Sequence, residues 1–130
     1  MDNKKKRKLK VKTKKLANSF KYATQGFLMS FKKERNMKIH IFIMLAVIIL
    51  GCILKISKIE WIICIILFGL VISGEMFNTA IETTVDIAMP FKNPKAKIAK
   101  DVSAGAVLIL AITSVIIGSM IFIPKILEIL

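Results

Sequence analysis

Three carboxylates and one amide recur at helical spacing near the middle of the chain, at Glu75, Asn78, Glu82 and Asp86. At about 100° per residue, the last three side chains point within roughly 60° of the first. The residues that precede Glu75 are almost wholly apolar, and ionisable groups inside a membrane span are expensive to desolvate. The spacing therefore predicts a functional acidic stripe on one face of a single helix.

Oxygen ligands of this kind suit Mg²⁺, which prefers one or two carboxylates together with substrate phosphates. Lys100 and Asp101, before the third apolar stretch, add a cation for phosphate and another acid, and Glu34 stands before the first stretch. The sequence has no Gly-x-x-x-x-Gly-Lys phosphate loop, no Ser/His/Asp set and no His/Cys cluster for zinc or iron. A deep carboxylate, a cation and Mg²⁺ are the parts that phosphoryl transfer needs.

The elements that must position these groups are membrane spans. The 130 residues are 55% hydrophobic, whereas about 45–50% is typical of a soluble domain. Apolar stretches at about 39–54, 61–88 and 102–123 predict an all-α membrane protein with three spans, the first of which needs its flanks or a tilt to cross about 30 Å of hydrocarbon.

Positive charges predict the orientation of the spans. Of the 21 Lys and Arg residues, most precede Ile39 or lie between the second and third stretches, so the amino terminus and the second loop are expected in the cytoplasm. Trp61 then lies at the outer interface, with Glu75 about 21 Å and Glu82 about 31 Å further inward along the helix. The acidic stripe therefore approaches the cytoplasmic boundary, where a nucleotide can reach it.

The amino-terminal region is strongly basic. Residues 1–15 are predicted to form a disordered arm that binds anionic lipid headgroups rather than nucleic acid, because it adjoins a membrane-embedded body. Residues 16–130 are predicted to form one domain. It begins with an amphipathic helix at the inner interface, whose apolar residues recur at steps of 4, 3, 4 and 4 from Leu16 to Phe31.

Three sequence motifs resemble those of one known family, the prokaryotic diacylglycerol kinases and undecaprenol kinases. They are Glu34-Arg-Asn36, then Gly74-Glu-Met-Phe-Asn78-Thr-Ala-Ile-Glu82-Thr-Thr-Val-Asp86, and finally Ala99-Lys100-Asp101 followed by Ser103-Ala-Gly-Ala-Val-Leu108. The resemblance runs from about Ser19 to Ile123. It implies a homotrimer of three-span subunits with a surface helix, in the bacterial cytoplasmic membrane, that uses MgATP to phosphorylate the hydroxyl of a membrane lipid.

The same resemblance implies roles for the individual residues. Glu75 looks like the general base, and Glu34 and Glu82 look like metal ligands that also meet the nucleotide. Asn78 and Asp86 would support the site. The remaining nucleotide contacts would come from Lys100 and Asp101 and, on the surface helix, from Tyr22 and Lys15.

Two lipids are candidates for the substrate. The Lys- and Ile-rich composition and the pattern of Glu34, Asn36 and His40 are similar to the undecaprenol branch, and diacylglycerol is the alternative. Two other classes of protein are less complete explanations. A small ion-coupled transporter that uses Glu75 does not explain the gathering of charged residues at the cytoplasmic edge, and an accessory membrane anchor that uses the basic arm does not explain the acidic stripe. His40, alone at the start of the first span, is predicted to be an interfacial or hydrogen-bonded histidine rather than a ligand.

Overall fold

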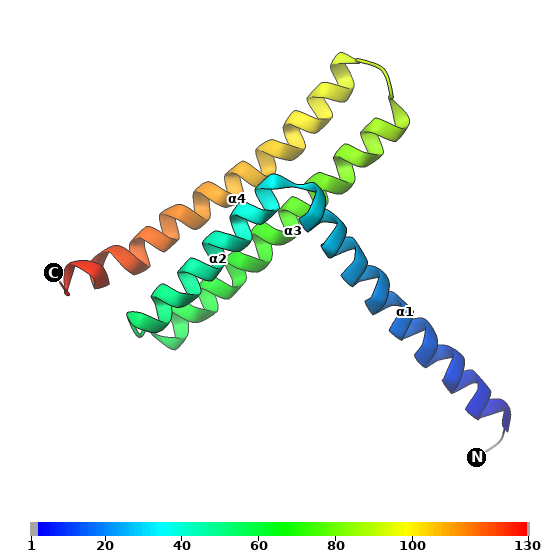
Figure 1. The fold of residues 1–130 in the computed structure, drawn as a ribbon, viewed down its shortest axis with the longest axis horizontal. Coiled ribbons are helices and arrows are strands. Elements are labelled where there is room, and N and C mark those ends of the chain that lie inside the picture. Colours follow the sequence, from blue (N-terminus) through cyan, green and yellow to red (C-terminus); the bar gives the residue numbers. More distant parts are fainter. Residues whose placement is uncertain (1–2, 130) are drawn as a thin grey trace. The chain divides into compact units, whose positions relative to one another are not determined.

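The structure, a computed structural model, describes residues 3–129 and is helical almost throughout (Figure 1). The chain divides after Lys33 into two units, which are described separately here. The first unit contains α1, and the second contains the three remaining helices. Their bounds are α1 Asn3–Lys33, α2 Arg35–Ile53, α3 Lys58–Ala88 and α4 Pro94–Leu127. The described residues contain no strand, which confirms the predicted all-α class.

The sequence predicted a disordered arm that ends at Lys15. In the structure, helix α1 begins at Asn3 and continues past Lys15 without a break. Lys and Arg are favourable helix formers, so a helix can continue through this segment although its side chains are exposed. The apolar residues Leu16 and Phe20 are also exposed, at 60% and 69%. This apolar face suits a helix that lies in a membrane interface. The division of the chain at residue 15 stays a prediction.

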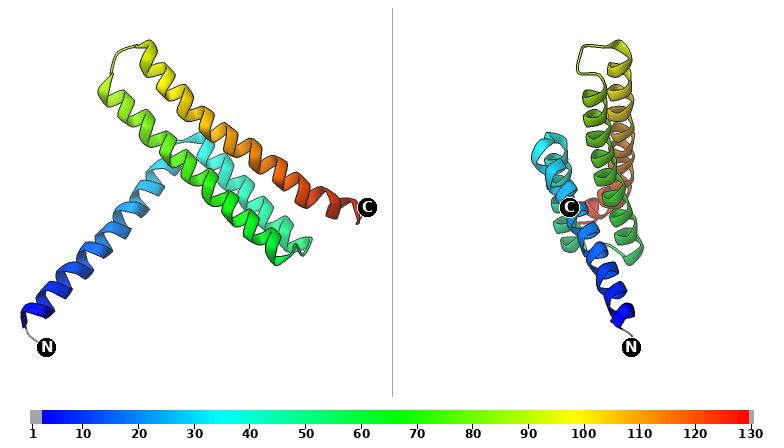
Figure 2. Two further views of the ribbon diagram at one scale, coloured as in Figure 1. Left: turned by 180° about the vertical axis from the view of Figure 1, so that it is seen from behind. Right: turned by 90° about the vertical axis from the view of Figure 1, so that its right-hand side faces the viewer.

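Within the second unit, α2 and α3 run antiparallel to each other, and so do α3 and α4 (Figures 1 and 2). Helix α3 packs against both α2 and α4, and its contact with α4 is the more extensive one. Short connections at residues 54–57 and 89–93 join the helices. Helix α3 is therefore the element that can hold a side chain against both neighbours.

Local signals fix the beginnings of α3 and α4. The hydroxyl of Ser57 accepts a hydrogen bond from the Glu60 backbone N–H, and the Glu60 carboxylate accepts one from the Ser57 N–H at 2.6 Å, which forms a capping box. Pro94 occupies the first turn of α4, and the Asn93 side chain accepts backbone N–H bonds there. Lys125, near the end of α4, lies 3.3 Å from Glu60 and joins the two helices at that end.

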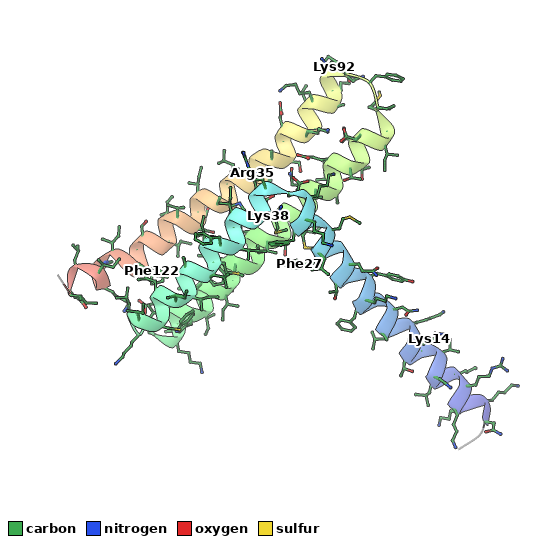
Figure 3. All side chains as sticks on the ribbon, viewed as in Figure 1. Lys14, Phe27, Arg35, Lys38, Lys92 and Phe122 are labelled. Carbon is green, nitrogen blue, oxygen red and sulfur yellow. The ribbon has the colours of Figure 1, made fainter. Side chains whose placement is uncertain are left out.

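The three helices of the second unit are long and apolar enough to cross a membrane. Each begins before its predicted apolar span, because flanking polar residues can continue a helix although they do not lengthen its hydrophobic part. Many large apolar side chains point outward from the helices, as Figure 3 shows, which fits a lipid environment. The inner contacts are few. One cluster, around Phe122, joins α4 to the beginning of α3 and the end of α2.

Candidate active site

The acidic stripe on α3 becomes more exposed along the helix. Glu75 is buried, with 1% of its surface exposed, and Asn78 is also buried. Glu82 is half-buried and Asp86 is exposed. The helix is continuous through all four residues. The stripe therefore runs from an enclosed carboxylate to an open one.

The buried carboxylate of Glu75 meets an imidazole from α2. His40 Nε2 lies 3.0 Å from Glu75 Oε1, and the His40 side chain is 19% exposed. The contact is close, but it does not have the geometry of a well-aligned hydrogen bond. A buried carboxylate is costly unless it is paired, and within residues 3–129 no lysine or arginine pairs with this one.

Asn78 connects the buried part of the stripe to the exposed part. Its Nδ2 donates a hydrogen bond to Glu82 Oε1, at 3.2 Å. Its Oδ1 is buried and has no hydrogen-bond partner in the part of the chain that the structure describes. Buried polar atoms are nearly always paired, so this oxygen is an acceptor open to a ligand or water.

The cation predicted for phosphate is engaged in a contact between helices. Lys100 of α4 forms an ion pair with Asp86 of α3, and Lys97 forms one with Asp101 within α4. Asp86 and Asp101 are both 61% exposed, and exposed ion pairs contribute only about 0–1 kcal/mol. Both pairs are therefore weak enough for a phosphate group to compete with them.

Glu34 is the residue before α2, where its side chain makes no capping hydrogen bond. It is half-buried, and both Glu34 and Glu82 are close enough to Glu75 to act on its charge. Among residues 3–129, no three acidic, histidine or cysteine side chains converge as a ready-made metal site. Mg²⁺ needs only one or two carboxylates when it shares its shell with phosphates, so the donors present fit that ion.

Tyr22 and Lys15 lie on α1, and both side chains are exposed. They belong to the first unit, which the structure describes by itself. Their predicted contact with the nucleotide stays a prediction.

The family model described as prokaryotic diacylglycerol kinase matches residues 21–122, which include α2, α3 and most of α4. The chain belongs to the prokaryotic diacylglycerol kinase family. The predicted family is thereby confirmed, and the chain is a lipid kinase rather than a transporter or a simple anchor.

Individual relatives in the family carry two different names. The chain is 45% identical over 107 residues to the undecaprenol kinase of Bacillus subtilis, an alignment that covers 82% of this chain and 87% of the relative. It is 38% identical over 113 residues to the diacylglycerol kinase of Synechocystis, with 86% of this chain and 65% of the relative covered. It is 34% identical over 108 residues to the diacylglycerol kinase of Haemophilus influenzae, with 82% and 92% covered.

Sequence reasoning did not find two features of this diacylglycerol kinase family member. His40 was not assigned to the site, although it contacts Glu75, because the two residues lie on different helices and no spacing rule links them. The close approach of α4 to Gly74 was also missed. A glycine directly before a functional acid in an apolar helix is the signal that could have indicated such an approach.

Proposed function

We propose that this lipid kinase transfers the γ-phosphoryl group of ATP to the hydroxyl of undecaprenol. The observation that carries the proposal is the buried carboxylate of Glu75 at the apolar end of an otherwise increasingly exposed acidic stripe. The family and the 45% identity to a relative named undecaprenol kinase support the choice of lipid.

In the proposed reaction, Glu75 accepts the proton of the lipid hydroxyl as the lipid oxygen attacks the γ-phosphorus. The new bond joins that oxygen to phosphorus, the bond from phosphorus to the β–γ bridging oxygen breaks, and ADP leaves. The general base must lie at the depth of a lipid hydroxyl, and Glu75 is the most deeply buried acid of the described chain.

Glu34 and Glu82 are the proposed ligands of Mg²⁺, which when bound neutralises charge on the phosphates. Asn78 holds Glu82 through its Nδ2, and its open Oδ1 is a further acceptor at the same place. Glu34, Asn78 and Glu82 would thus hold side-chain oxygen atoms in fixed positions on one side of the phosphates.

Lys100 and Asp101 are proposed to contact the nucleotide, with Tyr22 and Lys15 reaching it from α1. Phosphate is a stronger partner for a lysine than an exposed carboxylate, because it carries more charge. We therefore expect Lys100 to turn from Asp86 to the nucleotide when ATP binds. Asp86 then has a supporting role and holds Lys100 near the site between turnovers.

The site is proposed to face the cytoplasm, where ATP is available, with the basic residues of α1 on anionic headgroups. We also propose a homotrimer. A single chain buries Glu75 and Asn78 but leaves Asp86 exposed and Glu82 half-open, so a neighbouring subunit has room to complete the nucleotide side of the site. A native mass of three subunits in detergent is the expected result, and an active monomer would contradict a shared site.

Diacylglycerol is the second candidate substrate, because the relatives from Synechocystis and Haemophilus influenzae are named diacylglycerol kinases. The deciding experiment incubates the purified protein in detergent with γ-labelled ATP, Mg²⁺ and equal amounts of undecaprenol and diacylglycerol. We expect label mainly in undecaprenyl phosphate. Label mainly in phosphatidic acid would identify diacylglycerol as the substrate in place of undecaprenol. No label in either lipid would overturn the proposed reaction.

A further inference from the structure

The contact between His40 and Glu75 joins two helices at the most enclosed point of the proposed site. His40 is the only histidine of the chain, and its Nε2 lies 3.0 Å from Glu75 Oε1. Lys97 and Lys100 of α4 pair with other acids. The imidazole is therefore the group placed to fix the orientation of the buried carboxylate.

The contact suits one tautomer of the imidazole when Glu75 is ionised. A carboxylate can only accept hydrogen bonds, so an Nε2 that carries the proton can donate toward Oε1 across the 3.0 Å contact, whereas an unprotonated Nε2 cannot. Hydrogen bonds of catalytic groups are often poorly aligned before substrate binds, which accounts for the imperfect geometry here.

His40 also lines an apolar groove beside the proposed site. The groove has a volume of about 380 Å³ and lies between α2, α3 and α4. Its other lining residues, such as Val47, Leu67 and Phe68, are mostly apolar. That volume lies in the usual range of about 300–1,000 Å³ for small-molecule pockets. His40 thus contacts both the groove, which Glu75 does not line, and the buried Glu75 carboxylate.

We propose that His40 is a positioning residue that holds Oε1 of Glu75, so that the second carboxylate oxygen faces the lipid hydroxyl and accepts its proton. This inference rests on the proposed function, in which Glu75 is the base. His40 itself neither gains nor loses a bond in the step. It keeps its Nε2–H on Oε1 while the hydroxyl proton passes to Oε2.

The contact can be tested without measuring activity. In full-length protein labelled with ¹⁵N-histidine in detergent, the side-chain spectrum contains one imidazole. We expect the Nε2–H tautomer in the wild type and a changed Nε2 signal in Glu75→Gln, because an amide oxygen is a weaker acceptor than a carboxylate. Glu60→Gln, at the far end of α3, is the control and should leave the signal unchanged. The Nδ1–H tautomer, or an identical signal in wild type and Glu75→Gln, would overturn the proposal.

Kinetics then separate positioning from packing. His40→Leu removes the donor, and we expect kcat to fall by up to about 10²-fold, which is the scale for a misplaced reacting group, with KM for ATP within twofold. His40→Gln keeps an N–H near the same place and should recover most of that loss. Thr113→Ala, at an exposed position of α4 outside the groove, is the control and should keep wild-type kcat.

Wild-type kcat in His40→Leu, or a His40→Gln variant as slow as His40→Leu, would contradict a positioning role. A failure of the proposed function would give a different result. Wild-type protein would then label neither lipid, although the imidazole signal would still differ between wild type and Glu75→Gln. Should His40→Leu fail to fold, the spectrum and the His40→Gln rate decide the matter.

Discussion

Gly74 of α3 lies directly against Leu110 of α4. A Cβ atom added to Gly74 would come within 2.7 Å of Leu110 Cδ1, closer than real side chains allow. This is where α3 and α4 approach each other just before Glu75 in the sequence. The absence of a side chain at residue 74 therefore leaves room for the Leu110 side chain beside the helix that carries the proposed base.

We predict that Gly74→Ala lowers kinase activity several-fold, because either Leu110 must move or the two helices must separate. Overpacking of this kind typically costs about 1–3 kcal/mol. Gly105→Ala is the matched control, since a Cβ there meets nothing within 4 Å. Both changes give the same gain in helix propensity, so their difference in activity and in thermal inactivation temperature reports the contact. Leu110→Ala should restore part of the activity of Gly74→Ala. Equal behaviour of the two alanine variants would show that the approach is unimportant.

Replacement of the proposed metal ligands should change the response to Mg²⁺. Glu34→Gln and Glu82→Gln each remove a charged oxygen, so we expect the Mg²⁺ concentration for half-maximal activity to rise and high Mg²⁺ to recover part of the rate. Glu60→Gln removes an acid that pairs with Lys125 and should leave the titration unchanged. Mg²⁺ titrations that match the wild type in both site variants would mean that other groups hold the ion.

The basic segment before Lys15 should act on membranes rather than in catalysis. We expect a peptide of residues 1–33 to bind anionic vesicles more tightly than one of residues 15–33, by about 1 kcal/mol for each basic residue near the surface, with the difference reduced by salt. On neutral vesicles the two peptides should bind alike. Full-length protein and a variant that lacks residues 1–14 should have similar activity in detergent, and complete loss in the truncated protein would place the segment in the active site.

The sequence predicted the features that depend on neighbouring residues. Hydrophobic length identified the three spanning helices, and the period of the helix placed Glu75 and Asn78 on one face, both of which the structure buries. These predictions succeed because span length and helix periodicity are local properties that tertiary contacts rarely override.

The features that the sequence did not predict depend on contacts between helices. Neither the pairing of His40 with Glu75 nor the contact of Gly74 with Leu110 follows from spacing along one helix. Spacing along α4 likewise does not specify which acid of α3 pairs with Lys100, and in the structure it is Asp86. Each of the three helices also begins before its predicted span, and α4 continues beyond the end of its span, since apolar stretches mark the hydrocarbon core while the helices can extend outside it.

The measurement that tests the account most directly compares phosphoryl transfer by wild-type protein and Glu75→Gln, with γ-labelled ATP and undecaprenol in detergent. Gln keeps the size of Glu but cannot take up the hydroxyl proton, and loss of a general base typically costs about 10²–10⁴-fold. The account predicts a fall in kcat of that size while binding of ATP and thermal stability stay close to wild type. A Glu75→Gln enzyme that turns over within threefold of wild type would remove Glu75 from the reaction and contradict the central claim.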